Sequence, residues 1–309
     1  MVVGLGLHRP MTPAELGPIQ EFHPLQHDPD DVVPTAWVDG IQGSVFRPVA
    51  EAPYAIGVGV VELHQYAGVS GGHKAVAVGC GGRETIEALH DRARLLSPGV
   101  RIGNIDQNPF RQTVEELGRA ARCRLALVWV PAADCWLFGS PEGVVREGLR
   151  RLDPWVQVDT LADGAVLHVP PSKANTLYQA SRAATYLSES PHPPLKPGAT
   201  LVLRAHCSEG LGSESGFVAA LERSLPPWSE LLTGTPPTGA GAQRAVMMAK
   251  LAAKYRLRVE GCTDPSVFKA IGIDATSEVG PVSPTWLQVH DPFHQLPQYG
   301  HSLDSSPQS

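Results

Sequence analysis

The densest group of residues that could carry chemistry runs from His64 to Lys74 through a glycine-rich segment. A glycine-rich loop between a strand and a helix commonly binds phosphate, because its bare N–H groups can approach an anion closely. His73 separates Gly72 from Lys74, so this is not a Walker A loop, and its glycine spacing differs from the dinucleotide-binding fingerprint. The segment therefore indicates a phosphorylated ligand of a less common kind. The alternative is that its glycines only form a tight turn.

Two histidines follow predicted strands: His8 comes after the apolar residues 2–7, and His64 comes after residues 53–61. In a parallel α/β sheet, residues beyond the carboxyl ends of strands line the ligand crevice. Imidazole can act as acid or base near neutral pH, so the two are candidates for an acid–base pair. The alternative is that each caps its strand and bonds to backbone. His90, inside a helix predicted over residues 83–95, is on its own more typical of a surface or core histidine than of a ligand.

A third group lies in the second half of the chain, where Tyr178, Gln179 and Arg182 share a helix predicted over residues 172–187. Tyr178 and Arg182 are four residues apart, which places them on one helix face. Such a pair can hold a carboxylate, with a plain surface pair as the alternative.

The elements that must position these residues alternate between strand and helix, which predicts the α/β fold class. Thr12 predicts a helix start, with Pro13 in the first position and Glu15 closing a capping box. Residues 123–130, apolar apart from Arg124, predict a strand buried on both faces, as in a parallel sheet. The pattern restarts after Pro154. We therefore expect two α/β domains, residues 1–154 and 155–309, with a cofactor and substrate cleft between them and a loose tail from about residue 291.

The composition describes an ordinary globular chain, with 42% hydrophobic and 18% charged residues. A net charge of −6 argues against a nucleic-acid or membrane-surface binder, which would show a basic patch. The five cysteines are scattered and include no CxxC pair, which favours reduced thiols over a disulfide framework. With no long apolar run and no visible secretory signal, we expect a cytoplasmic protein.

Several of these motifs resemble one known family, the nickel-dependent lactate racemases and their 2-hydroxyacid racemase relatives. The resemblance is carried by the sequence LHRPMTPAEL at residues 7–16, HQYAGVSGGHK at residues 64–74, and His90. LYQA at residues 177–180 and CSEGLG at residues 207–212 are similar to motifs of the family's second domain. The resemblance to the family extends over essentially the whole chain except the tail.

The resemblance implies a first domain that binds a nickel-pincer nucleotide, a pyridinium mononucleotide with two sulfur-bearing arms. It implies that Lys74 is tethered covalently to one arm and that His90 is the protein ligand of the nickel. It also implies that His8 and His64 manage the hydroxyl proton of a small 2-hydroxy acid while hydride moves reversibly between the α-carbon and the cofactor. The remaining implied contacts are to the cofactor from Ser70, Gly71 and Gly72, and to the substrate from Tyr178, Gln179 and Arg182. The enzymes that make the cofactor are the implied partners.

The sequence departs from the family pattern in three places. His73 stands where the family usually has arginine, and Arg182 stands where we expect lysine, which keeps the charge but alters the geometry. The family's N-terminal segment with its Asp-x-Thr-Arg motif has no counterpart here, so we expect a truncated chain with exposed apolar surface. The alternative function is an inactive relative that binds a nucleotide cofactor without racemising. Nickel content separates the two.

Overall fold

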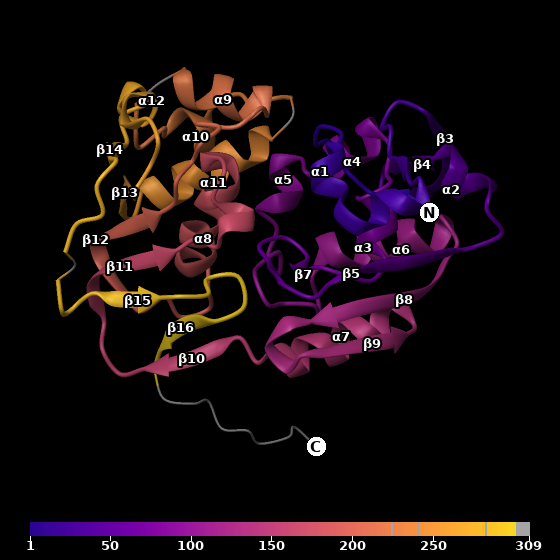
Figure 1. The fold of residues 1–309 in the computed structure, drawn as a ribbon, viewed down its shortest axis with the longest axis horizontal. Coiled ribbons are helices and arrows are strands. Elements are labelled where there is room, and N and C mark those ends of the chain that lie inside the picture. Colours follow the sequence, from indigo (N-terminus) through magenta and orange to yellow (C-terminus); the bar gives the residue numbers. More distant parts are fainter. Residues whose placement is uncertain (224, 240, 282, 301–309) are drawn as a thin grey trace. The chain divides into compact units, whose positions relative to one another are not determined.

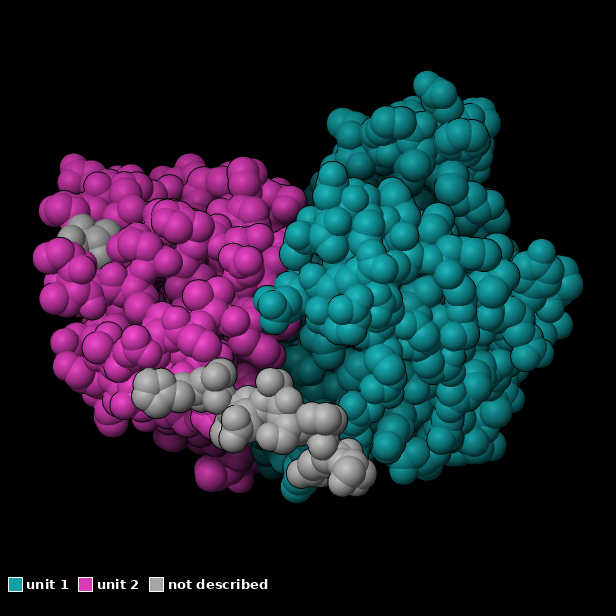
Figure 2. Space-filling view, turned by 90° about the horizontal axis from the view of Figure 1, so that it is seen from below, with its two compact units in different colours: residues 1–153 teal, residues 154–309 magenta. Residues whose placement is uncertain are grey.

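The computed structural model describes residues 1–223, 225–239, 241–281 and 283–300. The chain divides after Asp153 into two compact parts, which we call unit 1 (residues 1–153) and unit 2 (residues 154–309) (Figure 1, Figure 2). Each contains a sheet with parallel strand pairs together with helices, so the predicted α/β class is confirmed.

Unit 1 is built from short strands and helices around a three-stranded sheet. Its strands are β1 (Val2–Val3), β2 (Leu25–Gln26), β3 (Val32–Val38), β4 (Ile41–Phe46), β5 (Ala55–Val60), β6 (Leu63–His64), β7 (Gly68–Val69), β8 (Cys123–Val130) and β9 (Cys135–Gly139). Its helices are α1 (Pro13–Leu16), η1 (Gly17–Phe22), α2 (Arg47–Glu51), α3 (Lys74–Ala77), α4 (Arg83–Leu89), α5 (Arg92–Leu95), α6 (Pro109–Ala120), η2 (Pro131–Ala133) and α7 (Pro141–Leu152).

The main sheet of unit 1 has the order β5-β8-β9, with β5 parallel and β9 antiparallel to the central β8. Helix α3 packs against β5, and α7 packs against β8 and β9. Gly57 makes room for this packing, because a Cβ there would lie 2.9 Å from the carbonyl oxygen of Gly72. The glycine-rich segment therefore lies directly on the sheet.

The other face of this sheet corrects the expectation that residues 123–130 are buried on both sides. Side chains alternate across a strand, and every second residue of β8 is only partly buried. The neighbouring strands expose Ile56, Val58, Val60, Trp136 and Phe138, with Phe138 exposed to 64%. We call these five residues the open sheet face. Cross-strand pairing brings them into rows, such as Val58 with Leu127 and Leu127 with Phe138.

The N-terminal strand is shorter than expected. Only Val2–Val3 forms β1, pairing in parallel with β2, because the chain turns at Gly6, which has a φ of 57°. The predicted helix start is confirmed: Thr12 caps α1, and its side chain and that of Glu15 form a reciprocal capping box.

Unit 2 contains a fully parallel five-stranded sheet in the order β14-β13-β12-β11-β15 and a separate parallel pair, β10 with β16. Its strands are β10 (Trp155–Val158), β11 (Ala162–His168), β12 (Leu195–Arg204), β13 (Arg256–Glu260), β14 (Asp274–Thr276), β15 (Leu287–Val289) and β16 (Leu296–Tyr299). Its helices are η3 (Pro171–Lys173), α8 (Leu177–Ser188), α9 (Ser215–Glu222), α10 (Glu230–Thr233), α11 (Ala242–Ala252) and α12 (Pro265–Ala270).

Two predictions for unit 2 are corrected. The helix expected over residues 172–187 begins at Leu177, because Thr176 caps it by accepting the N–H of Gln179. The tail expected to be loose from about residue 291 instead forms β16, whose Leu296 is fully buried, and residues 301–309 lie outside the described residues. Within the described part of the chain, no helix has the length and apolar character needed to cross a bilayer.

Candidate functional site

The segment from His64 to Lys74 begins as a tight hairpin in which β6 and β7 pair antiparallel, with His64 opposite Gly68. Gly68 has a φ of 76°, and a Cβ there would lie only 2.1 Å from the carbonyl oxygen of Asn104. No other residue fits this position without moving the backbone of residue 104. The hairpin therefore fixes His64 at the start of the loop.

Ser70 connects the loop to the end of β5. Its Oγ accepts the N–H of Glu62 at 2.9 Å and donates to the carbonyl of Val60 at 2.5 Å. The hydroxyl is thus engaged with backbone on both sides, which shapes the loop. The cofactor contact expected of Ser70 stays a prediction.

Gly71 and Gly72 carry the chain from this point to α3 with φ angles of 88° and 62°, in the region that favours glycine. A Cβ on Gly72 would lie 2.7 Å from the carbonyl oxygen of Pro141 and 2.8 Å from a methyl of Val145. The loop therefore contacts the first turns of α7 closely, and Lys74 begins α3 immediately after it. Contacts of these glycines with a phosphate stay a prediction.

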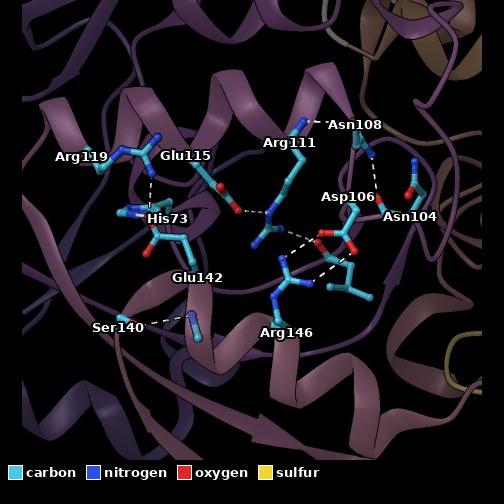
Figure 3. A network of polar contacts seen from close by, with 12 residues as sticks. His73, Asn104, Asp106, Asn108, Arg111, Glu115, Arg119, Ser140, Glu142 and Arg146 are labelled. Carbon is cyan, nitrogen blue, oxygen red and sulfur yellow. Dashed lines mark hydrogen bonds and ion pairs between the residues drawn. The ribbon is translucent and has the colours of Figure 1, made fainter. Parts of the chain in front are cut away.

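Two buried residues at the start of α6, which we call the α6 clamp, hold the same loop by its carbonyl groups. Asn108 donates through Nδ2 to the carbonyl oxygens of Tyr66 and Asn104, both at 2.8 Å, and its Oδ1 caps α6 by accepting the N–H of Arg111 (Figure 3). Arg111 donates through Nη1 to the carbonyl of Val69 at 3.0 Å. Asn108 is 0% and Arg111 1% exposed.

The α6 clamp was not expected from the sequence. Asn108 followed by Pro109 is a helix-start signal and could have located α6. The carbonyl partners, some 40 positions earlier in the chain, carry no sequence signal, because any residue type offers a carbonyl group.

His73 connects the loop to both neighbouring helices (Figure 3). Its ring is 1% exposed, and Nε2 lies 2.9 Å from Oε1 of Glu142, which also accepts from Arg119 at 2.7 Å. Burial lowers the pKa of His73, against the opposing effect of the Glu142 carboxylate. The neutral ring therefore donates from Nε2, and Nδ1 has no partner among the described residues. A side chain at Gly118 would collide with this ring.

The structure brings His64 and His90 to one aromatic cluster. The ring of Tyr66 lies 5.8 Å from His64 and 5.7 Å from His90, between ring centroids, and Phe110 completes the group at 5.2 Å from His90. His64 is 7% exposed and His90 is partly buried. Two of the histidines predicted from the sequence therefore contact the same tyrosine ring.

His90 does not lie inside a helix, as the sequence predicted, but caps the C-terminal end of α4. The helix stops there because Asp91 starts a new one, α5, by accepting the N–H of Ala93. Nδ1 of His90 lies 2.8 Å from the carbonyl of Ile86, so Nδ1 carries the proton and, in the neutral ring, Nε2 is the unprotonated nitrogen. A histidine that binds a metal is typically held in this way.

The described residues include no group of three or more His, Cys, Asp or Glu side chains that could hold a metal ion. A metal at His90 would therefore depend on donor atoms from a cofactor. Sulfur and carbon donors with one imidazole suit square-planar nickel, so the ring state of His90 fits the predicted group.

His8 is exposed and lies in the turn that follows β1. Its N–H donates to the carbonyl of Leu5, and the N–H of Gly6 donates to the carbonyl of Gly79, just after α3. The turn that carries His8 thus contacts the end of the helix that Lys74 begins. The predicted pairing of His8 with His64 stays a prediction.

The three residues predicted in unit 2 lie together in the first turns of α8. Nη1 of Arg182 donates to Oε1 of Gln179 at 2.9 Å, and the ring of Tyr178 packs edge-on against Phe217. Burial raises the pKa of Tyr178, although two arginines nearby act in the opposite direction. The CSEGLG segment positions this helix start, because the carbonyls of residues 210 and 211 accept the first N–H groups of α8. The contact of Tyr178, Gln179 and Arg182 with a substrate stays a prediction.

The fold is of the α/β class, and its glycine-rich loop is largely buried. His64 and His90 each bond to backbone through Nδ1. Residues 1–103 match the family model of the lactate racemase N-terminal domain. The curated lactate racemase of Lactiplantibacillus plantarum is 28% identical over 155 residues, 46% of this chain and 36% of that protein. The resemblance to the lactate racemase family is thereby confirmed, and it is matched most directly in unit 1.

Two solved structures share the fold at low sequence identity. The lactate racemase apoprotein of Thermoanaerobacterium thermosaccharolyticum superimposes with a TM-score of 0.81 and 18% identity, covering 96% of this chain and 78% of that one. A protein from Thermotoga maritima gives a TM-score of 0.69 and 14% identity, covering 96% of this chain and 84% of that one. At these identities the likeness establishes the architecture, and the activity is a separate question.

Proposed function

We propose that this chain is a racemase or epimerase of a small, lactate-like 2-hydroxy acid. The observation that carries the proposal is the pair of histidines that contact Tyr66: His64, which begins the loop that ends in Lys74, and His90. This arrangement lies in the part of the chain that matches the lactate racemase N-terminal domain.

The cofactor we propose is a nickel-pincer nucleotide, which when bound supplies a reversible acceptor and donor of hydride. Lys74 would hold it covalently, His90 would ligate the nickel through Nε2, and the loop of Ser70, Gly71 and Gly72 would lie against the nucleotide. The fit rests on Nδ1 of His90, which donates to the carbonyl of Ile86 as metal-binding histidines typically do, and on backbone that approaches closely at the two glycines. The protein's part is orientation and proton handling.

The chain's other residues would act on the substrate. His8 and His64 are the candidates to manage the hydroxyl proton, since imidazole serves either role near neutral pH. On α8, Arg182 with Tyr178 and Gln179 would hold the substrate carboxylate, for which the guanidinium is the natural partner. A cytoplasmic location and an encounter with the cofactor-making enzymes belong to the same proposal.

The test begins with the intact mass of the protein expressed beside the cofactor-making enzymes. Lys74 is the only lysine in residues 1–153, so a lysine adduct mapped to unit 1 can lie nowhere else. We expect Lys74→Ala to remove the mass shift and Lys196→Ala, at an exposed lysine of unit 2, to keep it. We expect His90→Ala to lower nickel content.

Racemisation of either lactate enantiomer, followed by chiral chromatography, then tests the activity itself. Loaded protein that carries nickel yet interconverts no 2-hydroxy acid would contradict the racemase proposal. An undiminished adduct on Lys74→Ala would contradict the assignment of the tether.

A further inference from the structure

The five-stranded sheet of unit 2 reverses its direction of growth at one point, between β11 and β15. From β11 the chain adds β12, β13 and β14 in turn on one side, and it then places β15 on the other side of β11 (Figure 1). In open parallel sheets, ligands bind outside the carboxyl ends of the strands at such a topological switch point. The residues at the carboxyl ends of β11 and β15 therefore occupy the position where a sheet of this kind binds a ligand.

Two histidines lie at this switch point. His168 is the last residue of β11, and His290 directly follows β15, one step beyond the register pair of Leu167 and Val289. Their rings stack with centroids 4.5 Å apart and planes inclined by 21°; His168 is partly buried and His290 is exposed. Nε2 of His168 lies 3.0 Å from Oε1 of Gln288, which orients that ring. The switch point therefore presents two imidazoles side by side.

The histidine pair continues a row of polar residues across the carboxyl ends of the strands. In register, His168 lies beside Arg204 of β12, and Arg204 lies beside Glu260 of β13. Arg204 binds the Glu260 carboxylate and the carbonyl of Gly280, so its charge is compensated on that side. A metal ion is disfavoured at the two histidines, because the next residue in the row is a cation and the described residues include no group of three ligating side chains.

A lysine adds a third basic group at the switch point. Lys173 ends η3, the turn that follows β11, and its ammonium lies 5.9 Å from the ring centroid of Phe293, in the segment that follows β15. The acidic residue next to His290 is already engaged, because the carboxylate of Asp291 lies 2.8 Å from Nδ1 of His294. Imidazole and ammonium groups bind carboxylate and phosphate oxygens through charge-assisted hydrogen bonds. The chemistry of this group therefore suits an anion.

We propose that the switch point of unit 2 binds a doubly charged oxyanion, a phosphate group or a dicarboxylate, with His168, His290 and Lys173 as its donors. η3 connects His168 to the start of α8, so this anion site lies at the same edge of the sheet as the first turn of that helix. The inference concerns binding alone and does not depend on the proposed racemase activity.

The full chain without cofactor suffices for the test. ¹H–¹³C spectra of the histidine rings follow titrations with inorganic phosphate, malonate and acetate at constant pH and ionic strength. We expect the rings of His168 and His290 to respond to phosphate or malonate with half-saturation on the order of 1 mM, and to acetate at least about tenfold more weakly. A tighter response to phosphate identifies a phosphorylated ligand, and a tighter response to malonate identifies a dicarboxylate. His192, an exposed histidine at the opposite edge just before β12, is the internal control.

Variants then separate the site from general attraction of anions. His168→Ala and His290→Ala assign the signals, and each should weaken the response of the remaining ring about tenfold or more, because each removes a charge-assisted hydrogen bond. Lys173→Ala keeps both rings and should weaken both responses, whereas His192→Ala should change neither. Unshifted signals of the other histidines show that a variant is folded. Rings of His168 and His290 that show no saturable response in the unmodified chain, or respond no more strongly than His192, would overturn the proposal.

Discussion

Replacement of Asn108 by alanine tests how much of the loop depends on the α6 clamp. Loss of the Oδ1 cap costs about 1 kcal/mol. The carbonyl of Tyr66, left buried without its donor, costs about 1–3 kcal/mol, and the less buried carbonyl of Asn104 adds a smaller amount. We therefore expect Asn108→Ala to lower the free energy of unfolding of unit 1 by about 2–5 kcal/mol.

Ser140 offers a matched control, because it caps α7 through its side chain but is exposed and holds no loop. Ser140→Ala should cost only about 1 kcal/mol. Because the chain has two units and need not unfold in one step, urea titrations should be read by hydrogen exchange resolved to peptides. We expect amides of residues 66–74 to lose protection in Asn108→Ala and to keep it in Ser140→Ala. Equal effects of the two variants would refute the clamp as the support of the loop.

Two further predictions concern the same region. Gly72→Ala should destabilise unit 1 by about 2–4 kcal/mol in urea unfolding, because residue 72 has a left-handed φ and a Cβ there would overlap with Pro141. Gly59→Ala is the control and should be nearly neutral, because its Cβ would lie in open space. A small effect of Gly72→Ala would contradict the close approach of the loop to α7. Burial lowers the pKa of His73 and His27, so both bind a proton more readily in the unfolded chain than in the folded one. The stability that the two neutral rings contribute is therefore fully present above about pH 6.5, and it is lost as the pH falls toward their pKa values in the folded chain. We expect unit 1 to lose stability on acidification in this window and His73→Gln to flatten the loss in urea titrations at several pH values; an unchanged slope would refute the contribution of His73.

Local sequence signals predicted the parts of the fold that depend on near neighbours. The capping box of Thr12 and Glu15 and the strand that became β5 both result from residues within one turn or one strand. The helix expected over residues 83–95 was wrong in its middle, because the Asp91 cap competes successfully with continuation of α4. The spacing of apolar residues does not show whether a helix continues or a new helix starts at a residue such as Asp91.

The sequence suggested candidate site residues but not the contacts that support the loop. His64, His90 and Lys74 stand in a motif that the sequence displays, whereas the carbonyl contacts of the α6 clamp and the contact of His73 with Glu142 join positions about 40 or more apart. The burial of residues 123–130 was likewise misjudged, because an apolar strand reads the same whether one or both of its faces are covered.

The α6 clamp acts on main-chain oxygens, and this affects how the loop can change its sequence. Asn108 and Arg111 hold the carbonyls of Tyr66 and Val69, which every residue type provides. A substitution of the side chain at either position keeps the carbonyl group that the clamp binds. The path of the loop therefore depends on main-chain contacts from residues 108 and 111, in addition to the packing of the buried side chains of Tyr66 and Val69.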